Sequence, residues 1–181
     1  MKGRLLALVG LSLLLAACTT PPVTVGLSDV DLDLSVALDT AGKVLFPQTP
    51  LAARDPIPGT SVASVTIQGD AYLDSPANVS FDVYAAATDP GTLGCQEVGS
   101  PLTGTFYACD ASTAGIAKVS QKTIAFKGGT GPVSFTLRGP VLAEGINRQS
   151  LYLGAVIGGA TAGNILHLKN LTATVQLNVG K

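Results

Sequence analysis

The chain has 181 residues, of which 46% are hydrophobic and 13% are charged, and its formal net charge is −1 at pH 7. This share of apolar residues is sufficient for a folded core and excludes a largely disordered chain. The Lys and Arg residues are few and scattered. This argues against a nucleic-acid partner, because such binding requires clustered basic side chains.

The N-terminus has the pattern of a secretory signal. Lys2 and Arg4 precede an apolar run over residues 5–15, and positive charge followed by a short apolar region is typical of signal peptides. The run is shorter than the roughly 20 apolar residues that a membrane-spanning helix requires. We therefore expect residues 1–17 to be removed after export.

The apolar run ends in Leu15, Ala16, Ala17 and Cys18. This order resembles the lipobox of bacterial lipoproteins, and the resemblance covers residues 1–18 only. It implies that the chain is cut before Cys18, that the cysteine thiol carries a diacylglycerol, and that the new amine takes a further acyl chain such as palmitate. Each CH₂ group of an acyl chain that is buried in a bilayer contributes roughly 0.8 kcal/mol to binding. The expected partner of the lipid on Cys18 is therefore a membrane.

The mature chain is expected to begin with a short tether. Residues 18–23 include Pro21 and Pro22, which block helix formation. Residues 24–181 then form a single domain. Removal of the signal takes two basic residues, so the mature chain has 11 − 2 = 9 basic and 12 acidic residues, a net charge near −3.

The residue after the expected lipid site bears on location. In many two-membrane bacteria, an aspartate in this place retains a lipoprotein at the inner membrane. Thr19 follows Cys18 here. The resemblance therefore implies a cell-envelope protein anchored in the outer membrane, where the cell has one.

The rest of the sequence alternates between apolar and polar residues, a period of two that is typical of strands. The clearest strand is expected over residues 29–39. Further strands are expected over residues 61–73, 79–87, 118–126, 133–137, 150–157 and 165–179, with brief pairing at 44–46. Glycine-rich and proline-rich turns separate several of these segments. The pattern predicts an all-β antiparallel β-sandwich, immunoglobulin-like or jelly-roll-like, of roughly seven to nine strands.

Helix signals are weak in this sequence. Residues 111–121 are expected to form at most one short helical turn, because glycine and β-branched residues disfavour a longer helix. Residues 42–59 contain four prolines and are expected to be an irregular connection around the brief pairing at 44–46.

Two cysteines remain once Cys18 carries lipid, and we expect Cys95 and Cys109 to form a disulfide in an oxidising compartment. Both positions are equidistant from Leu102, which lies in a turn-like segment, so a hairpin around that turn would bring them together. A bridge that closes about 15 residues is worth roughly 3 kcal/mol. A metal site at these cysteines would need further ligands that the nearby sequence lacks.

Several acidic residues and the single histidine are candidates for chemical sites. Asp29, Asp31 and Asp33 could suggest a calcium loop, but they alternate with apolar residues and lack the turn glycine. We therefore expect a solvated strand face. His167 lies between leucines in an expected strand and should be exposed. No Gly-Xaa-Ser-Xaa-Gly motif supports its use in a Ser-His-Asp triad.

Other candidate sites are equally weak. Glu97 and Glu144 are the only glutamates, and both lie near glycines in expected loops, which does not favour a glycosidase pair. The sequence has no Trp, and its four tyrosines fit core or rim positions better than a sugar platform. The Asn78 and Asn170 glycosylation patterns are interpreted as accidental in a bacterial lipoprotein.

We therefore expect no catalytic residues, no cofactor and no metal site. Two function classes are favoured, and an enzyme is a third, less favoured class because the sequence shows no nucleophile, metal cluster or phosphate loop. The first is a non-catalytic envelope protein that is structural or contacts another envelope protein. The second is a surface binding module for carbohydrate or another small ligand. A pocket lined by two or more tyrosines would favour ligand binding, and a flat apolar patch would favour a protein partner.

Overall fold

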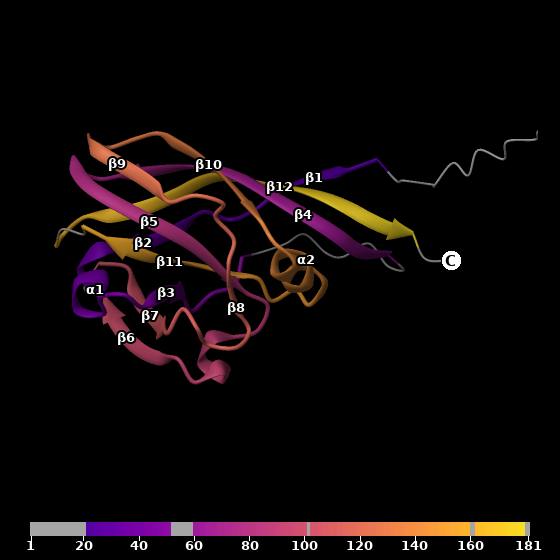
Figure 1. Ribbon diagram of the computed structural model, residues 1–181, viewed down its shortest axis with the longest axis horizontal. Coiled ribbons are helices and arrows are strands. Elements are labelled where there is room, and N and C mark those ends of the chain that lie inside the picture. The colour runs from indigo at the N-terminus through magenta and orange to yellow at the C-terminus, as the bar shows by residue number, and fades with distance from the viewer. Residues whose placement is uncertain (1–20, 52–59, 101, 160–161, 180–181) are drawn as a thin grey trace, which may run out of the picture.

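The structure is a computed structural model that describes residues 21–51, 60–100, 102–159 and 162–179. The expected signal and Cys18 lie outside these residues, as do residues 52–59 of the proline-rich 42–59 segment. The described chain is mostly strands in two antiparallel sheets, with few helices (Figure 1). The predicted all-β sandwich is confirmed.

One sheet, here sheet A, contains the two longest strands. Its members are β1 (Val23–Gly26), β2 (Val30–Asp33), β4 (Thr60–Leu73), β10 (Val133–Arg138) and β12 (Ile165–Val179). The order is β1, β12, β4, β10, and β2 also pairs with β12. Because β1 and β2 pair with different ends of β12, the last strand holds the first two in place.

The other sheet, here sheet B, has the order β6, β7, β3, β11, β5, β8, and β9 also pairs with β5. Its strands are β3 (Val44–Pro47), β5 (Ala77–Ala86), β6 (Gln96–Ser100), β7 (Gly104–Cys109), β8 (Ile116–Lys118), β9 (Ile124–Gly129) and β11 (Tyr152–Gly158). The described residues thus contain more strands than the expected seven to nine, because several short strands carry little periodic signal.

The core lies between the two sheets. The alternation over β5 turns Val79, Phe81 and Val83 inward, and all three are buried. Full burial of such a side chain contributes roughly 1.5–3 kcal/mol. On β11, Gly154 leaves room for a neighbouring strand, since a Cβ there would lie 2.4 Å from the backbone oxygen of Leu45.

One side of the sandwich is closed by β8, β9 and β10. Residues 118–126 were expected to form one strand, but β8 ends at Lys118 and β9 begins at Ile124. Between them, the Ser120 hydroxyl accepts the backbone N–H of Val83 at 3.0 Å. Ser120 also forms a bridge with Leu137 of β10, which joins the edges of the two sheets.

The strand predicted over residues 29–39 is wrong in its second half. β2 ends at Asp33, and Leu34–Asp39 form the helix α1. The reason is local, because the Asp33 carboxylate accepts the backbone N–H of Ser35 at 2.8 Å and caps the helix. Leu34 and Val36 are buried, so the same apolar residues serve a helix as well as they would serve a strand.

Two further short helices were not predicted. The helix η1 (Pro90–Leu93) follows an Asp89 cap, and α2 (Pro140–Asn147) begins with proline at its first position. α2 packs against β4 and β5. The 111–121 segment contains turns and β8 and no helix.

Candidate functional site

A groove of about 1040 Å³ opens on the outer face of sheet A. It lies over β4, β10 and the middle of β12, and residues 121–125 form its other wall. Its polar lining comes from strand positions that face away from the core and from the wall segment. These side chains include Gln68, Asp70, Lys122, Ser134, Thr136 and Asn170.

Asp70 is the hydrogen-bonding centre of this groove. Its carboxylate accepts the Ser134 hydroxyl at 2.7 Å and the Asn170 side-chain amide at 3.2 Å. Asn170 has a φ of 55°, at a register shift between Lys169 and Thr172 of β12. The irregularity in β12 therefore brings an amide to Asp70.

Gly69 allows the strands to pack closely under the groove. A Cβ at this position would lie 2.5 Å from Cδ2 of Leu171 and 3.1 Å from the Lys169 backbone oxygen. A larger residue would clash with the Leu171 side chain and crowd the Lys169 backbone oxygen of β12. The groove thus presents amides, hydroxyls, one amine and one carboxylate on a floor fixed by glycine, a set suited to hydrogen bonding with a hydroxyl-rich ligand.

His167 lies farther along the same face of sheet A. Its Nδ1 is 2.7 Å from Asp31 Oδ1, and its Nε2 is 2.7 Å from Asp74 Oδ1. The side chain is 16% exposed, so the expectation of an exposed residue is wrong, although its place in a strand is confirmed. Two carboxylates bury much of the ring by accepting hydrogen bonds from both sides.

The two carboxylates favour the protonated form of His167. Burial acts to lower the pKa of the imidazole, but the hydrogen bonds and negative charges of Asp74 and Asp31 outweigh it, and the pKa is raised above its usual value of 6.5. When protonated, the ring donates both N–H groups and ties β2 to the turn that follows β4. Neither nitrogen is then available as a general base.

The aspartates expected on one solvated strand face divide between two environments. Asp31 is half-exposed and contacts His167, whereas Asp33 is fully buried. Burial acts to raise the pKa of Asp33, yet hydrogen bonds from Ser100 and Ser35 outweigh it and the pKa is lowered. The expected solvated face is therefore wrong for Asp33, which caps α1 and contacts the β6–β7 turn.

Three tyrosines lie on the outer face of sheet B and form a second, smaller core. Tyr152 is buried there with Phe46, and Tyr84 and Tyr107 are half-buried around them. η1 contacts this cluster, since a Cβ at Gly91 would lie 2.9 Å from the Tyr107 ring. The pKa of Tyr152 is raised, mainly by burial and to a smaller extent by the negative charge of Asp89. These tyrosines pack, and among the described residues no tyrosine lines the groove.

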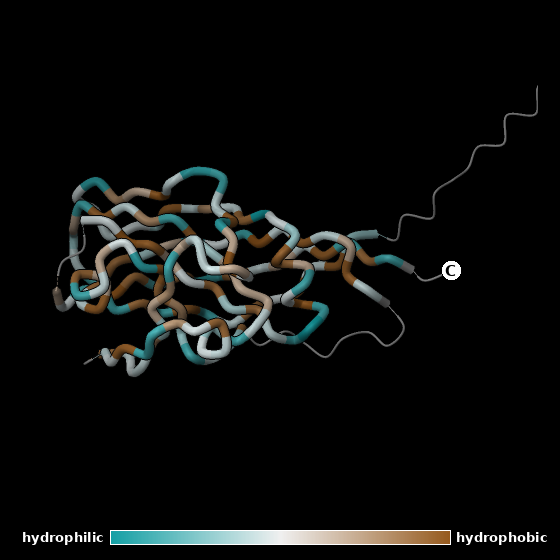
Figure 2. The backbone as a smooth tube through the Cα atoms, turned by 60° about the horizontal axis from the view of Figure 1, so that its bottom comes forward, coloured by the Kyte–Doolittle hydropathy of each residue, from teal (hydrophilic) through white to brown (hydrophobic). Residues whose placement is uncertain are grey.

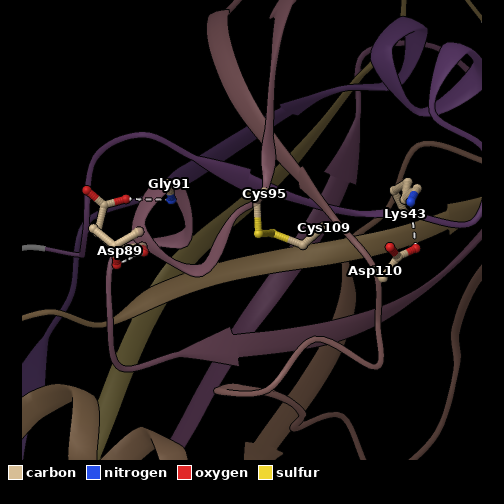
Figure 3. The surroundings of a disulfide bond; sticks show 7 residues. Lys43, Asp89, Gly91, Cys95, Cys109 and Asp110 are labelled. Carbon is tan, nitrogen blue, oxygen red and sulfur yellow. Dashed lines mark hydrogen bonds and ion pairs between the residues drawn. A yellow bond between two sulfur atoms is a disulfide. The ribbon is translucent and has the colours of Figure 1, made fainter.

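The disulfide predicted between Cys95 and Cys109 is confirmed, with a Cα–Cα distance of 4.6 Å (Figure 3). β6 and β7 pair in a register centred on position 102, which places Ser100 opposite Gly104. Lys43 and Asp110 form an ion pair nearby at 2.5 Å. The bridge fixes the end of the hairpin beside η1.

The remaining candidates lie on separate elements. Glu97 is on β6, and Glu144 is on α2, where it pairs with Arg148 at 2.7 Å. Across the described ranges, no group of three His, Cys, Asp or Glu side chains is placed to hold a metal ion. Within the same residues, no helix combines the length and apolar character needed to cross a bilayer. Cys18 lies outside the described residues.

Comparison with known proteins found no matching family model, no matching curated protein and no matching solved structure. The groove and the Asp31–His167–Asp74 cluster were missed in the sequence. Gln68 and Asp70 occupy outward positions of an expected strand, and this was the one feature of the sequence that could have indicated the groove. Their approach to Ser134 and Asn170 depends on strand pairing across 64 and 100 residues.

Proposed function

We propose that this protein is a lipid-anchored cell-envelope protein whose β-sandwich acts by binding rather than by catalysis. The lipobox-like sequence over residues 15–18, preceded by two basic residues and an apolar run, supports export and lipidation. The lipid on Cys18 inserts into the membrane, which is therefore one partner of the protein. The sandwich serves a structural role or contacts another envelope protein.

The start of the folded domain is the observation that favours this proposal most. Val23 already pairs with Val175 of β12, and it lies 23 − 18 = 5 positions after Cys18. Five residues span at most about 18 Å. A tether of this length keeps the sandwich beside the bilayer, where an envelope partner would meet it.

Fatty-acid labelling in a bacterial host tests this proposal. The wild-type protein should take up label, and Cys18→Ser should not. The Cys95→Ser/Cys109→Ser double variant is the matched control, because it removes two other cysteines and should keep the label. Label that persists in Cys18→Ser would contradict the lipid anchor.

The groove on sheet A favours a second candidate function, a surface binding module for carbohydrate. Asp70, Ser134 and Asn170 offer acceptors and donors in a groove large enough for a ligand. A soluble domain beginning at Thr20 should bind oligosaccharides from the envelope, and Asp70→Ala should weaken binding at least tenfold. Asp39→Asn, on the exposed end of α1, is the matched control. Equal binding by wild type and Asp70→Ala would remove the groove as the site.

A further inference from the structure

Charge is distributed unevenly along the length of sheet A. Residues 21–28, 60–69 and 170–179 contain no Asp, Glu, Lys, Arg or His. These ranges include all of β1, most of β4 and the second part of β12. The ionisable residues of β2, β4, β12 and the turn after β4 lie beyond them and include Asp31, Asp70, Asp74, His167 and Lys169. On β10, Arg138 pairs with Thr66, six positions after the start of β4.

The uncharged ranges form a three-stranded ribbon. Thr60 pairs with Val179, so the start of β4 and the end of β12 form the tip, and Val23 pairs with Val175, so β1 begins beside β12 four residues short of it. Figure 1 shows this ribbon extending beyond sheet B and α2, with the described end of β12 and the start of β1 on the same side. Hydrophobic and intermediate colours predominate along it in Figure 2.

Apolar side chains remain accessible at this ribbon. Val23 is 38% exposed, which makes it one of the large apolar residues on the surface. Val25 and Val62 are only partly buried against the core. Their polar neighbours on the ribbon are Ser, Thr, Gln and Asn, which hydrogen-bond without carrying charge.

We propose that the tip of this ribbon lies against the membrane surface, and that the charged half of sheet A points away from it. The inference rests on the proposed lipid anchor. Cys18 is within about 18 Å of Val23 along the chain, so the lipid brings this tip to the headgroups before any other part of the domain.

The charge distribution supports this orientation. Asp70 follows Thr60 by 70 − 60 = 10 positions along β4, or about 33 Å at 3.3 Å per residue. The Debye length at physiological ionic strength is about 8 Å. The carboxylates of sheet A lie far enough from the tip to avoid repulsion by anionic lipids, and its uncharged strands lose no ionic hydration at the interface. On α2, which contacts β4, the Glu144 carboxylate is paired with Arg148.

Depth-dependent quenching in the lipidated full-length protein tests the orientation. Ala63→Cys and Thr24→Cys place a thiol at exposed positions of the ribbon, and Lys127→Cys places one on β9 at the opposite end. Lipid occupies Cys18 and the disulfide occupies Cys95 and Cys109, so the introduced thiol is the one that a fluorophore labels. The protein is reconstituted in phosphatidylethanolamine and phosphatidylglycerol vesicles that carry a headgroup quencher.

Quenching at Ala63 and Thr24 should be several-fold stronger than at Lys127. Co-sedimentation with equal quenching at all three positions would overturn the orientation and leave the lipid anchor intact. Failure of the protein to co-sediment with the vesicles would overturn both the orientation and the lipid anchor. Crosslinking of Thr24→Cys between two copies, without quenching, would assign the ribbon to self-association and also overturn the membrane contact.

Discussion

The side-chain amide of Asn147 makes two hydrogen bonds with the backbone of Val62. Its Oδ1 accepts the Val62 N–H at 2.8 Å, and its Nδ2 donates to the Val62 oxygen at 3.1 Å. β10 pairs with β4 only from Thr66 onward. Asn147, at the end of α2, therefore takes the place of a neighbouring strand on this open edge.

Asn147→Ala should lower the free energy of unfolding by about 1–2 kcal/mol, because it removes two hydrogen bonds that are partly replaced by water. It should also increase aggregation, since an unpaired edge accepts strands from other molecules. Urea unfolding and light scattering measure the two effects. Asn78→Ala, at an exposed position on β5, is the control and should leave the scattering unchanged.

Asp33 should make the domain sensitive to acid. Its lowered pKa means that its contribution is present above the unfolded pKa of about 3.9 and is lost as the pH falls through the folded pKa. The Ser100 oxygen already accepts the N–H groups of Leu102 and Thr103, so its proton is directed to Asp33. An asparagine nitrogen could not accept that proton.

Asp33→Asn should therefore cost about 2 kcal/mol at pH 7, since a hydrogen bond to a charged group is lost. It should also flatten the dependence of stability on pH below 5. Chemical unfolding between pH 3 and pH 7 measures both changes. Asp39→Asn, outside this network, should keep the wild-type profile, and an unchanged slope in Asp33→Asn would contradict the assignment.

His167 should act in the opposite direction. Because its folded pKa is raised, its contribution to stability is complete below the unfolded pKa of about 6.5 and is lost as the pH rises through the folded pKa. His167 is the only histidine in the sequence, so one imidazole signal in an untagged protein reports its titration by NMR. The midpoint should lie above 6.5.

Asp31→Asn and Asp74→Asn should each lower that midpoint, and the double variant should lower it further, because each removes one negative charge beside the ring. Asp82→Asn is the control, since Asp82 pairs with Lys118 on sheet B. A midpoint at or below 6.5 in the wild type would show that burial prevails over the two carboxylates.

The Cys95–Cys109 bridge should stabilise the domain by roughly 3 kcal/mol, the value expected for a closed loop of about 15 residues. The Cys95→Ser/Cys109→Ser variant should unfold at lower urea concentration than the wild type. Reductant should destabilise the wild type and leave the double variant unaffected. Equal midpoints with and without reductant in the wild type would contradict this contribution.

The sequence predicts the long strands and the disulfide because both depend on local periodicity. β4, β5 and β12 are each ten or more residues long and alternate over most of their length, and the cysteines are symmetric about one turn. α1 was misassigned because its six residues are too few for a helical period to outweigh the alternation. A single capping contact from Asp33 then decides the conformation.

The groove and the histidine cluster were beyond sequence reasoning for a different reason. His167 and Asp31 are 136 residues apart, and their contact requires that β2 pair with the start of β12. Alternation places each side chain on a face but does not state which strands are neighbours. Strand order is set by packing of the whole sandwich.

The position of β12 between β1, β2 and β4 also has a consequence for the order of folding. β1 and β2 have no partner in sheet A until residues 165–179 have been synthesised. Contacts over such sequence separations form slowly, because a long chain must first be brought together. The nascent chain therefore cannot complete this sheet early, which would keep it extended for the proposed export across a membrane.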